Sequence, residues 1–151
     1  MYSDTITLFN RYEDGSKTIW YPSIIRGVNL VTDKAAIAAK YGSESTDNAV
    51  LNIRYCIVDG NKMIGDKIWL PPKKWKAQEV GLLSSTLTCS GGEGFDFFFA
   101  EEWENEEPIP DDAYSINGLY DHLNTKYDYV FAISSIGGPY SAVPHFEIMG
   151  K

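Results

Sequence analysis

The stretches YDYVFAISSI (residues 127–136) and PHFEIMG (residues 144–150) decide the predicted fold class. The first is a mostly apolar run of strand length. The second alternates apolar Phe146 and Ile148 with polar side chains, which is the period of a half-buried strand. The connection GGPYSA (residues 137–142) contains the Gly and Pro residues that are typical of loops. The chain is therefore predicted to end in two strands joined by a flexible connection.

More strands are predicted on the N-terminal side of this pair. In TITLFNRY (residues 5–12), Ile6 and Leu8 would lie on one side of the strand and Thr7 and Phe9 on the other. The other predicted strands are short apolar or alternating runs between turn residues. TIWYPSII and VNLV, which Gly27 separates, would complete a meander with the first strand. AVLNIRYCIV and MIGDKIWL would form a hairpin with its turn at Asp59-Gly60 or Gly60-Asn61. STLTC and GFDFFFA would form another hairpin across Ser90-Gly91-Gly92.

One helix is predicted in the C-terminal half, over about residues 111–125. Ile116, Leu119, Tyr120 and Leu123 have the i, i+3, i+4, i+7 spacing of one helix face. The two aspartates at the start of this segment would lie near the positive end of the helix dipole.

Three further segments are predicted to be loops or short turns. Residues 32–48 combine an alanine-rich half with a small-polar half, which is typical of a long, adaptable loop. KKWKAQEVGLL (residues 73–83) would make one or two helical turns with Pro72 near the start. EEWENEEPIPDD (residues 101–112) is too acidic and too rich in proline for a strand, so we expect a solvated loop.

Length and composition favour a single domain, residues 1–151, of the mainly β (α+β) class, a small β-barrel or sandwich. Thirteen basic and 21 acidic residues give a net charge of -8, which argues against a nucleic-acid-reading protein. No apolar run reaches the roughly 20 residues that span a bilayer, and the start lacks the order of a signal peptide. We expect a chain made in the cytoplasm that does not enter a membrane.

No residue pattern marks an active site or a metal site. His145 and Glu147 would lie on the same face of the last strand, but no nucleophile motif accompanies them. The two histidines of the chain also lack metal-ligand spacing. Cys56 and Cys89 are expected to be reduced thiols in a core. We therefore predict a binding or structural protein that is not an enzyme and has no cofactor and no metal.

Several motifs resemble one protein family. LTCSGGEGFDFFFAEEW is similar to a strand-turn-strand of head-tail connector proteins of tailed bacteriophages, with Gly94, Asp96 and Phe97 to Phe99 at the matching positions. ITLFNRY, WYPSIIRGVNL, DNAVLNIRY and KYDYVFAISSIGGPYSAVPHFEIMGK look like the same group, the minor capsid or stopper-like head-completion proteins of prophages. The ending on His145, Phe146, Ile148, Gly150 and Lys151 also fits this group. The chain departs from it at residues 33–41 and at PPKKWKAQEVGLL.

The resemblance implies a small β-barrel that assembles as a ring between the portal or adaptor and the tail, and that helps to retain packaged DNA. The partners would be other copies of the chain and the portal, adaptor and tail proteins. Double-stranded DNA would pass through without sequence-specific binding. The protein would be made in the cytoplasm of the bacterial host and would be located in the virion, at the head-tail junction.

Two groups of residues are candidates for these contacts. The first group would line the channel or join neighbouring subunits, and it lies in the long loop: Asp33, Lys34, Ile37, Lys40, Tyr41, Glu44 and Asp47. The second group would face a partner with aromatic and acidic side chains: Phe98, Trp103, Glu101 and Glu102.

Two hypotheses from other classes remain open. Trp20, Trp69, Trp75 and Trp103, with many tyrosines, would suit a carbohydrate- or surface-binding β module that stacks on sugar rings. A small hydrolase that uses His145 and Glu147 would place a pocket around that pair.

Overall fold

The computed structural model describes residues 2–32 and 48–151. The predicted loop over residues 32–48 therefore lies outside the described residues, except for its two ends. All seven candidate residues of that loop lie outside them as well, so they stay predictions.

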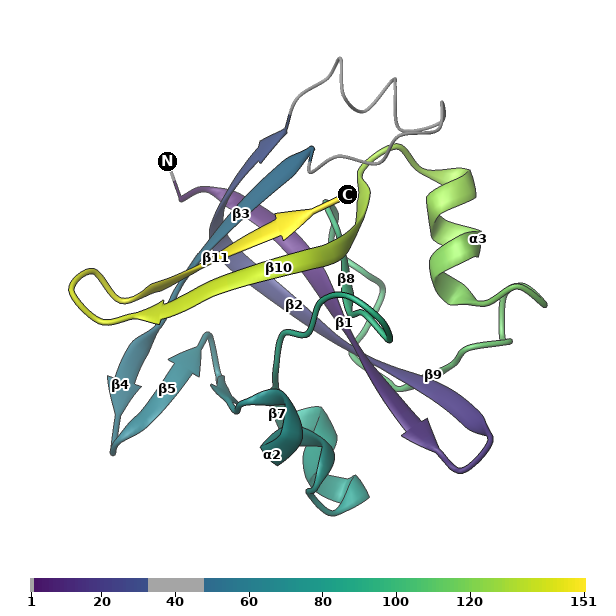
Figure 1. The fold of residues 1–151 in the computed structure, drawn as a ribbon, viewed down its shortest axis with the longest axis horizontal. Helices are drawn as coiled ribbons and strands as arrows, with labels where there is room; N and C mark the ends of the chain where they lie inside the picture. The colour runs from purple at the N-terminus through teal and green to yellow at the C-terminus, as the bar shows by residue number, and fades with distance from the viewer. Residues whose placement is uncertain (1, 33–47) are drawn as a thin grey trace.

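Six strands form a closed antiparallel barrel (Figure 1). Their order is β1-β8-β10-β11-β3-β2, and β2 pairs with β1 to close the barrel. This confirms the predicted mainly β fold and identifies it as a barrel. The strands are β1 (Asp4–Asp14), β2 (Lys17–Thr32), β3 (Ala49–Arg54), β8 (Phe97–Phe99), β10 (Val130–Tyr140) and β11 (His145–Gly150).

Within residues 2–32 and 48–151, the structure also contains a smaller four-stranded sheet and three short helices. The sheet has the order β4-β5-β6-β7, and a two-residue strand, β9, extends the barrel at β2. No helix in the described part of the chain is long and apolar enough to cross a membrane. The elements are β4 (Cys56–Val58), β5 (Asn61–Ile64), β6 (Lys67–Trp69), β7 (Thr86–Leu87), β9 (Ile109–Pro110), α2 (Pro72–Lys76), the 3₁₀ helix η1 (Val80–Ser85) and α3 (Leu119–Lys126).

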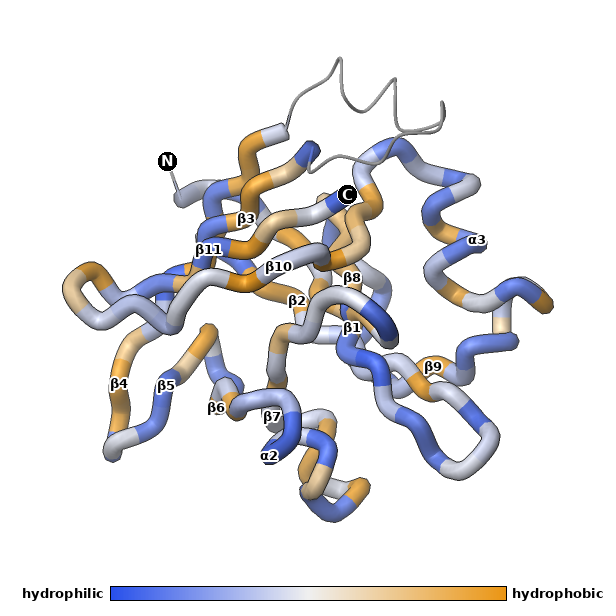
Figure 2. The backbone as a smooth tube through the Cα atoms, in the orientation of Figure 1, coloured by the Kyte–Doolittle hydropathy of each residue, from blue (hydrophilic) through white to orange (hydrophobic). Residues whose placement is uncertain are grey.

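The barrel strands bury side chains on both faces, and this gives the molecule two large cores. In β1, Ile6 and Leu8 belong to one core, whereas Phe9 belongs to a second core that α3 covers. In β8, Phe98 belongs to the first core while its two phenylalanine neighbours belong to the second. The alternation predicted for residues 5–12 is therefore confirmed, and both of its faces are buried. Figure 2 shows hydrophobic stretches on strands such as β3 and hydrophilic ones in α2.

Several predicted boundaries are confirmed. Asp59 (φ 53°) and Gly60 (φ 80°) form the two-residue turn between β4 and β5. The segment after the double proline forms α2 and η1, as predicted. By contrast, TIWYPSII and VNLV form one strand, because Gly27 has a φ of 71° and continues the backbone through an irregular position instead of a turn. MIGDKIWL is divided into β5 and β6 by a turn at Gly65.

The hairpin predicted between residues 85–89 and 94–100 is wrong. β7 pairs in parallel with β6, whereas β8 lies between β1 and β10. The apolar triplet of β8 is buried on both faces, because one core lies on one side of the strand and the α3-covered core lies on the other.

The helix predicted over residues 111–125 begins only at Leu119. Gly118 has a φ of 101°, which is incompatible with a helix, and the Asp111 carboxylate accepts a hydrogen bond from the Leu119 N–H at 3.0 Å. The aspartate therefore caps the helix from a distance of eight residues in the sequence. Ile116, which was predicted to lie on the buried helix face, is 96% exposed.

Candidate partner-binding surface

The acidic segment, residues 101–112, is bound to the barrel by hydrogen bonds. The hydroxyl group of Thr7, in β1, donates to the Glu101 carbonyl at 2.7 Å and accepts from the Trp103 N–H at 2.9 Å. The Thr7 side chain is fully buried, so these bonds are shielded from water. The segment was predicted to be a solvated loop. Its charges are mostly exposed, but its backbone is fixed to β1.

Two acidic side chains attach the same segment to β2. Glu102 forms a salt bridge of 2.8 Å with Arg26, and both side chains are exposed. Glu106 accepts a hydrogen bond from the Ile24 N–H at 2.8 Å and lies 3.5 Å from the Lys67 ammonium group. The second attachment is the stronger one, because a half-buried carboxylate that satisfies a backbone N–H is screened less than an exposed ion pair.

Lys67 is the buried cation of this arrangement. Its ammonium group donates to the Ser23 hydroxyl group at 2.8 Å and to the Pro22 carbonyl at 3.4 Å. Burial lowers the pKa of Lys67, and Glu106 opposes that effect. Lys67 therefore joins the small sheet, the barrel strand β2 and the acidic segment at one point.

An aromatic cleft of about 460 Å³ lies beside the acidic segment. Trp103 packs edge to face on Phe9 at 5.7 Å and on Tyr114 at 5.9 Å, measured between ring centroids. Tyr114 stacks on His122 of α3 at 5.4 Å. These contacts hold the rings of Trp103 and Tyr114 in place as two aromatic walls of the cleft, beside the carboxylates of Glu104 and Glu107. The cleft is lined by Trp103, Glu104, Asn105, Glu107, Pro108, Ile109, Pro110, Ala113 and Tyr114.

A comparison with protein-family models assigns the chain. It belongs to DUF6751, a family of unknown function, whose model matches residues 1–151. No curated protein and no solved structure matches it. The function of this DUF6751 member is therefore inferred from the chemistry of its described residues.

The structure brings together only some of the predicted partner-facing residues of this DUF6751 chain. Glu101 and Glu102 are exposed in the acidic segment, and Trp103 is half-buried in the wall of the cleft. Phe98 was predicted to face a partner, and that prediction is wrong: its side chain is fully buried in the barrel core. Consecutive strand residues point to opposite faces, and all three phenylalanines of β8 are buried, Phe98 in the first core and its two neighbours in the second.

Sequence reasoning missed Tyr114 as a member of the cleft. Tyr114 lies two residues after the acidic segment, inside the helix that was predicted over residues 111–125, so it was not considered as a cleft residue. It also missed Thr7 and Lys67, which attach the acidic segment. A lysine inside the run MIGDKIWL was the available signal, because a cation in an apolar strand needs a carboxylate partner.

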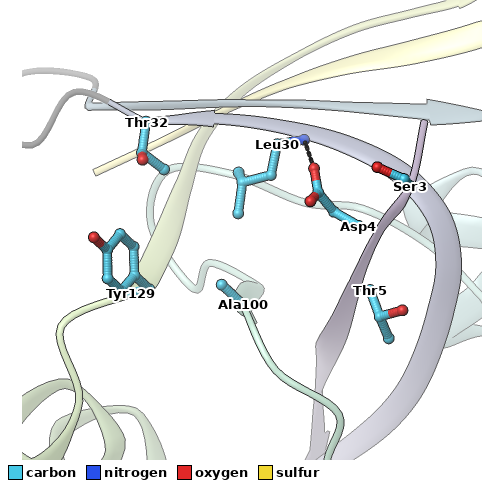
Figure 3. Close-up of a pocket in the computed structure, with 7 residues that line it drawn as sticks. All are labelled: Ser3, Asp4, Thr5, Leu30, Thr32, Ala100 and Tyr129. Carbon is cyan, nitrogen blue, oxygen red and sulfur yellow. Dashed lines mark hydrogen bonds between the residues drawn. The ribbon is translucent and has the colours of Figure 1, made fainter. Parts of the chain in front are cut away.

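A second cleft, of about 320 Å³, lies where β2 leads towards the undescribed residues (Figure 3). Among its described lining residues Asp4 is the charged one, and its carboxylate accepts a hydrogen bond from the Leu30 N–H at 2.9 Å. The other lining residues are Ser3, Thr5, Leu30, Thr32, Ala100 and Tyr129. This composition offers polar contacts but no acid–base pair.

His145 and Glu147 lie on the same, half-exposed face of β11, as predicted. His145 Nδ1 is 2.6 Å from the Val143 carbonyl, and its ring lies 5.0 Å from that of Tyr140. In the described chain no hydrogen bond joins His145 to Glu147, and the Ser134 hydroxyl group donates to the Met149 carbonyl. No group of three or more metal-ligating side chains occurs in residues 2–32 and 48–151.

The cysteine prediction is half correct. Cys89 is a buried thiol in the barrel core, whereas Cys56 is exposed on β4. β4 is a short strand at the edge of the small sheet with all three residues exposed, so its apolar character did not indicate burial.

Proposed function

We propose that this chain is a structural subunit of a bacteriophage head-tail connector, of the stopper-like head-completion type. It would assemble as a ring between the portal or adaptor and the tail, and would help to retain packaged DNA. The observation that supports this proposal most is the closed antiparallel barrel, because the resemblance to connector proteins implies that architecture.

The charge distribution supports the proposal independently. The acidic segment contains seven acidic residues and no basic residue, and the whole chain has a net charge of -8. A chain with this net charge repels the phosphate backbone, so DNA would pass the ring without being bound.

The proposal also specifies partners and location. The partners are further copies of the chain and the portal, adaptor and tail proteins, with no cofactor. The protein would be made in the cytoplasm of the host and would end in the virion, at the head-tail junction. Its role there would be binding and sealing, not catalysis.

Inactivation of the gene in a phage that carries it tests this proposal. We expect separate heads and tails, with heads that lose their DNA, because the joining layer is missing. Supplying the protein from a plasmid should restore infectious particles. Complete, DNA-filled virions produced in its absence would contradict the proposal.

A carbohydrate-binding module is the second candidate function, and the aromatic cleft favours it. Trp103 and Tyr114 provide rings beside polar side chains, a combination that suits sugar faces. The other support for this hypothesis is weaker, because Trp20 and Trp75 are buried and cannot stack on a ligand. Quenching of tryptophan fluorescence by oligosaccharides, lost in Trp103→Ala, would favour this candidate.

A further inference from the structure

One face of the molecule concentrates exposed basic side chains. Lys73, Lys74 and Lys76 of α2 are exposed within four positions, and no other part of the sequence has such a density of basic residues. The following η1 adds exposed Val80 (57%) and Leu82 (50%). We call Pro72–Lys76 and Val80–Ser85 together the α2–η1 face.

This face has a fixed conformation. Trp75, between the lysines, is fully buried, and its ring packs edge to face on Tyr12 at 6.2 Å and on Tyr21 at 5.8 Å. Leu83 of η1 belongs to the same small core. A partner would therefore meet lysines and apolar side chains on a backbone that is already ordered, which lowers the entropic cost of binding.

The acidic segment carries charge that the molecule itself leaves uncompensated. Of its seven acidic residues, two form salt bridges within the described chain, Glu102 and Glu106, so five remain without one (7 − 2 = 5). Glu104 and Glu107 are exposed at the aromatic cleft, and their side chains form no hydrogen bond or ion pair with described residues. Like charges held close together repel each other, and a basic partner would relieve that repulsion.

We propose that the α2–η1 face of one copy of this chain docks on the acidic segment and aromatic cleft of a second copy. The lysines would pair with Glu104 and Glu107. Val80 and Leu82 would contact the ring walls that Trp103 and Tyr114 form. The occupant is a second copy because this chain itself carries the basic, partly apolar surface that an acidic, aromatic cleft requires.

The two surfaces are different, so the contact is heterologous. In Figure 1, α2 lies below the barrel strands, whereas α3, whose His122 stacks on Tyr114 of the cleft, lies to their right. Repetition of a heterologous contact produces a ring if the rotation closes and a filament if it does not. The inference thus deepens the proposed function and rests on it, because it assigns the contact between subunits of the ring.

Charge reversal on each surface tests the inference. We would compare the wild type, Lys73→Glu/Lys74→Glu and Glu104→Lys/Glu107→Lys by sedimentation velocity at about 0.1 M and about 1 M salt, where the screening lengths are about 10 and 3 Å. The wild type should associate at low salt and dissociate at high salt. Each variant should associate roughly tenfold more weakly at low salt, because two pairs of opposite charges become pairs of like charges.

An equimolar mixture of the two variants is the decisive sample. Each variant then offers the other a surface of opposite charge, at the same average net charge as the wild type, so association should return. Lys62→Glu/Lys151→Glu reverses two basic residues elsewhere and should behave as the wild type. A monomeric wild type at both salt concentrations, unchanged variants, or a mixture that fails to recover would overturn the inference.

Capture by portal and adaptor proteins separates this inference from the proposed function. Unchanged self-association of both reversal variants, with normal capture of the wild type, would refute the docking contact and leave the connector function. Self-association that follows the charge pattern, without any capture of the wild type, would support the contact and refute the connector function.

Discussion

At the scale of single residues, Asp96 is a buried carboxyl group whose pKa lies well above its ordinary value. Its carboxyl group is buried and accepts hydrogen bonds from the backbone N–H groups of Arg11 and Ser90, both at 2.8 Å, and from the Asn10 side chain at 3.0 Å. Burial raises the pKa of Asp96 to about 7, although these donors and Lys76 act in the opposite direction. The group links β1 to the segment that precedes β8.

This raised pKa gives a pH dependence of stability. Between the ordinary carboxyl pKa of 3.8 and about 7, the folded chain binds a proton that the unfolded chain has lost, so stability falls as the pH rises. We expect the free energy of unfolding to decrease by about 1–3 kcal/mol from pH 5 to pH 8. Asp96→Asn should be less stable but lack this decrease. Urea denaturation measures both, and a wild-type stability that rises over this interval would contradict the assignment.

Gly118 fixes the start of α3. A Cβ atom there would lie 2.9 Å from both carboxylate oxygens of Asp111, and the φ of 101° disfavours any other residue. Gly118→Ala should therefore cost about 1–3 kcal/mol of unfolding free energy and weaken the bond from Trp20 Nε1 to Asp111, which is 2.6 Å long. Gly81→Ala is the matched control, because its Cβ would meet nothing within 4 Å. Equal thermal unfolding temperatures of the two variants would refute this role.

At the scale of elements, the attachment of the acidic segment is the feature that sequence did not reveal. Glu106→Ala would leave the Ile24 N–H without its acceptor and Lys67 without its carboxylate. We expect a loss of about 1–3 kcal/mol and faster amide hydrogen exchange at Ile24 and through residues 101–107. Glu107→Ala, one position further, removes an exposed carboxylate and should change neither. Slow exchange retained in Glu106→Ala would show that the attachment does not hold the segment.

The sequence predicted the elements whose cause is local. Alternation along residues 5–12 and 144–150 gave strands, and Asp59-Gly60 gave a turn, because side-chain period and positive φ are properties of neighbouring residues. The mainly β class followed from many such segments. The same local logic predicted α2 from a proline at the helix start.

The failures concern contacts between distant segments. The parallel pairing of β6 with β7 and the place of β8 between β1 and β10 depend on partners that no local pattern identifies. The delayed start of α3 depends on Asp111, which also binds Trp20 across the molecule. In the candidate surface, Trp103 could be predicted because it lies within the acidic segment itself. Thr7 and Lys67 could not, because they are distant in the sequence and meet the acidic segment only in the folded chain.

At the scale of the whole molecule, the barrel is closed and its surfaces differ in charge. Closure of β1 on β2 leaves the barrel without an open edge, so assembly would use side-chain surfaces instead of barrel strand addition. The edge strands of the small sheet, β4 and β7, have only three and two residues. Basic and acidic surfaces on different sides suit a repeated head-to-tail contact better than a symmetric dimer.

Native mass spectrometry of the purified chain, alone and mixed with any portal and adaptor proteins encoded beside it, tests the central claim most directly. The account predicts stoichiometric capture of several copies into one ring-sized complex with those partners. A chain that remains monomeric and uncaptured across the range of salt concentrations would contradict it.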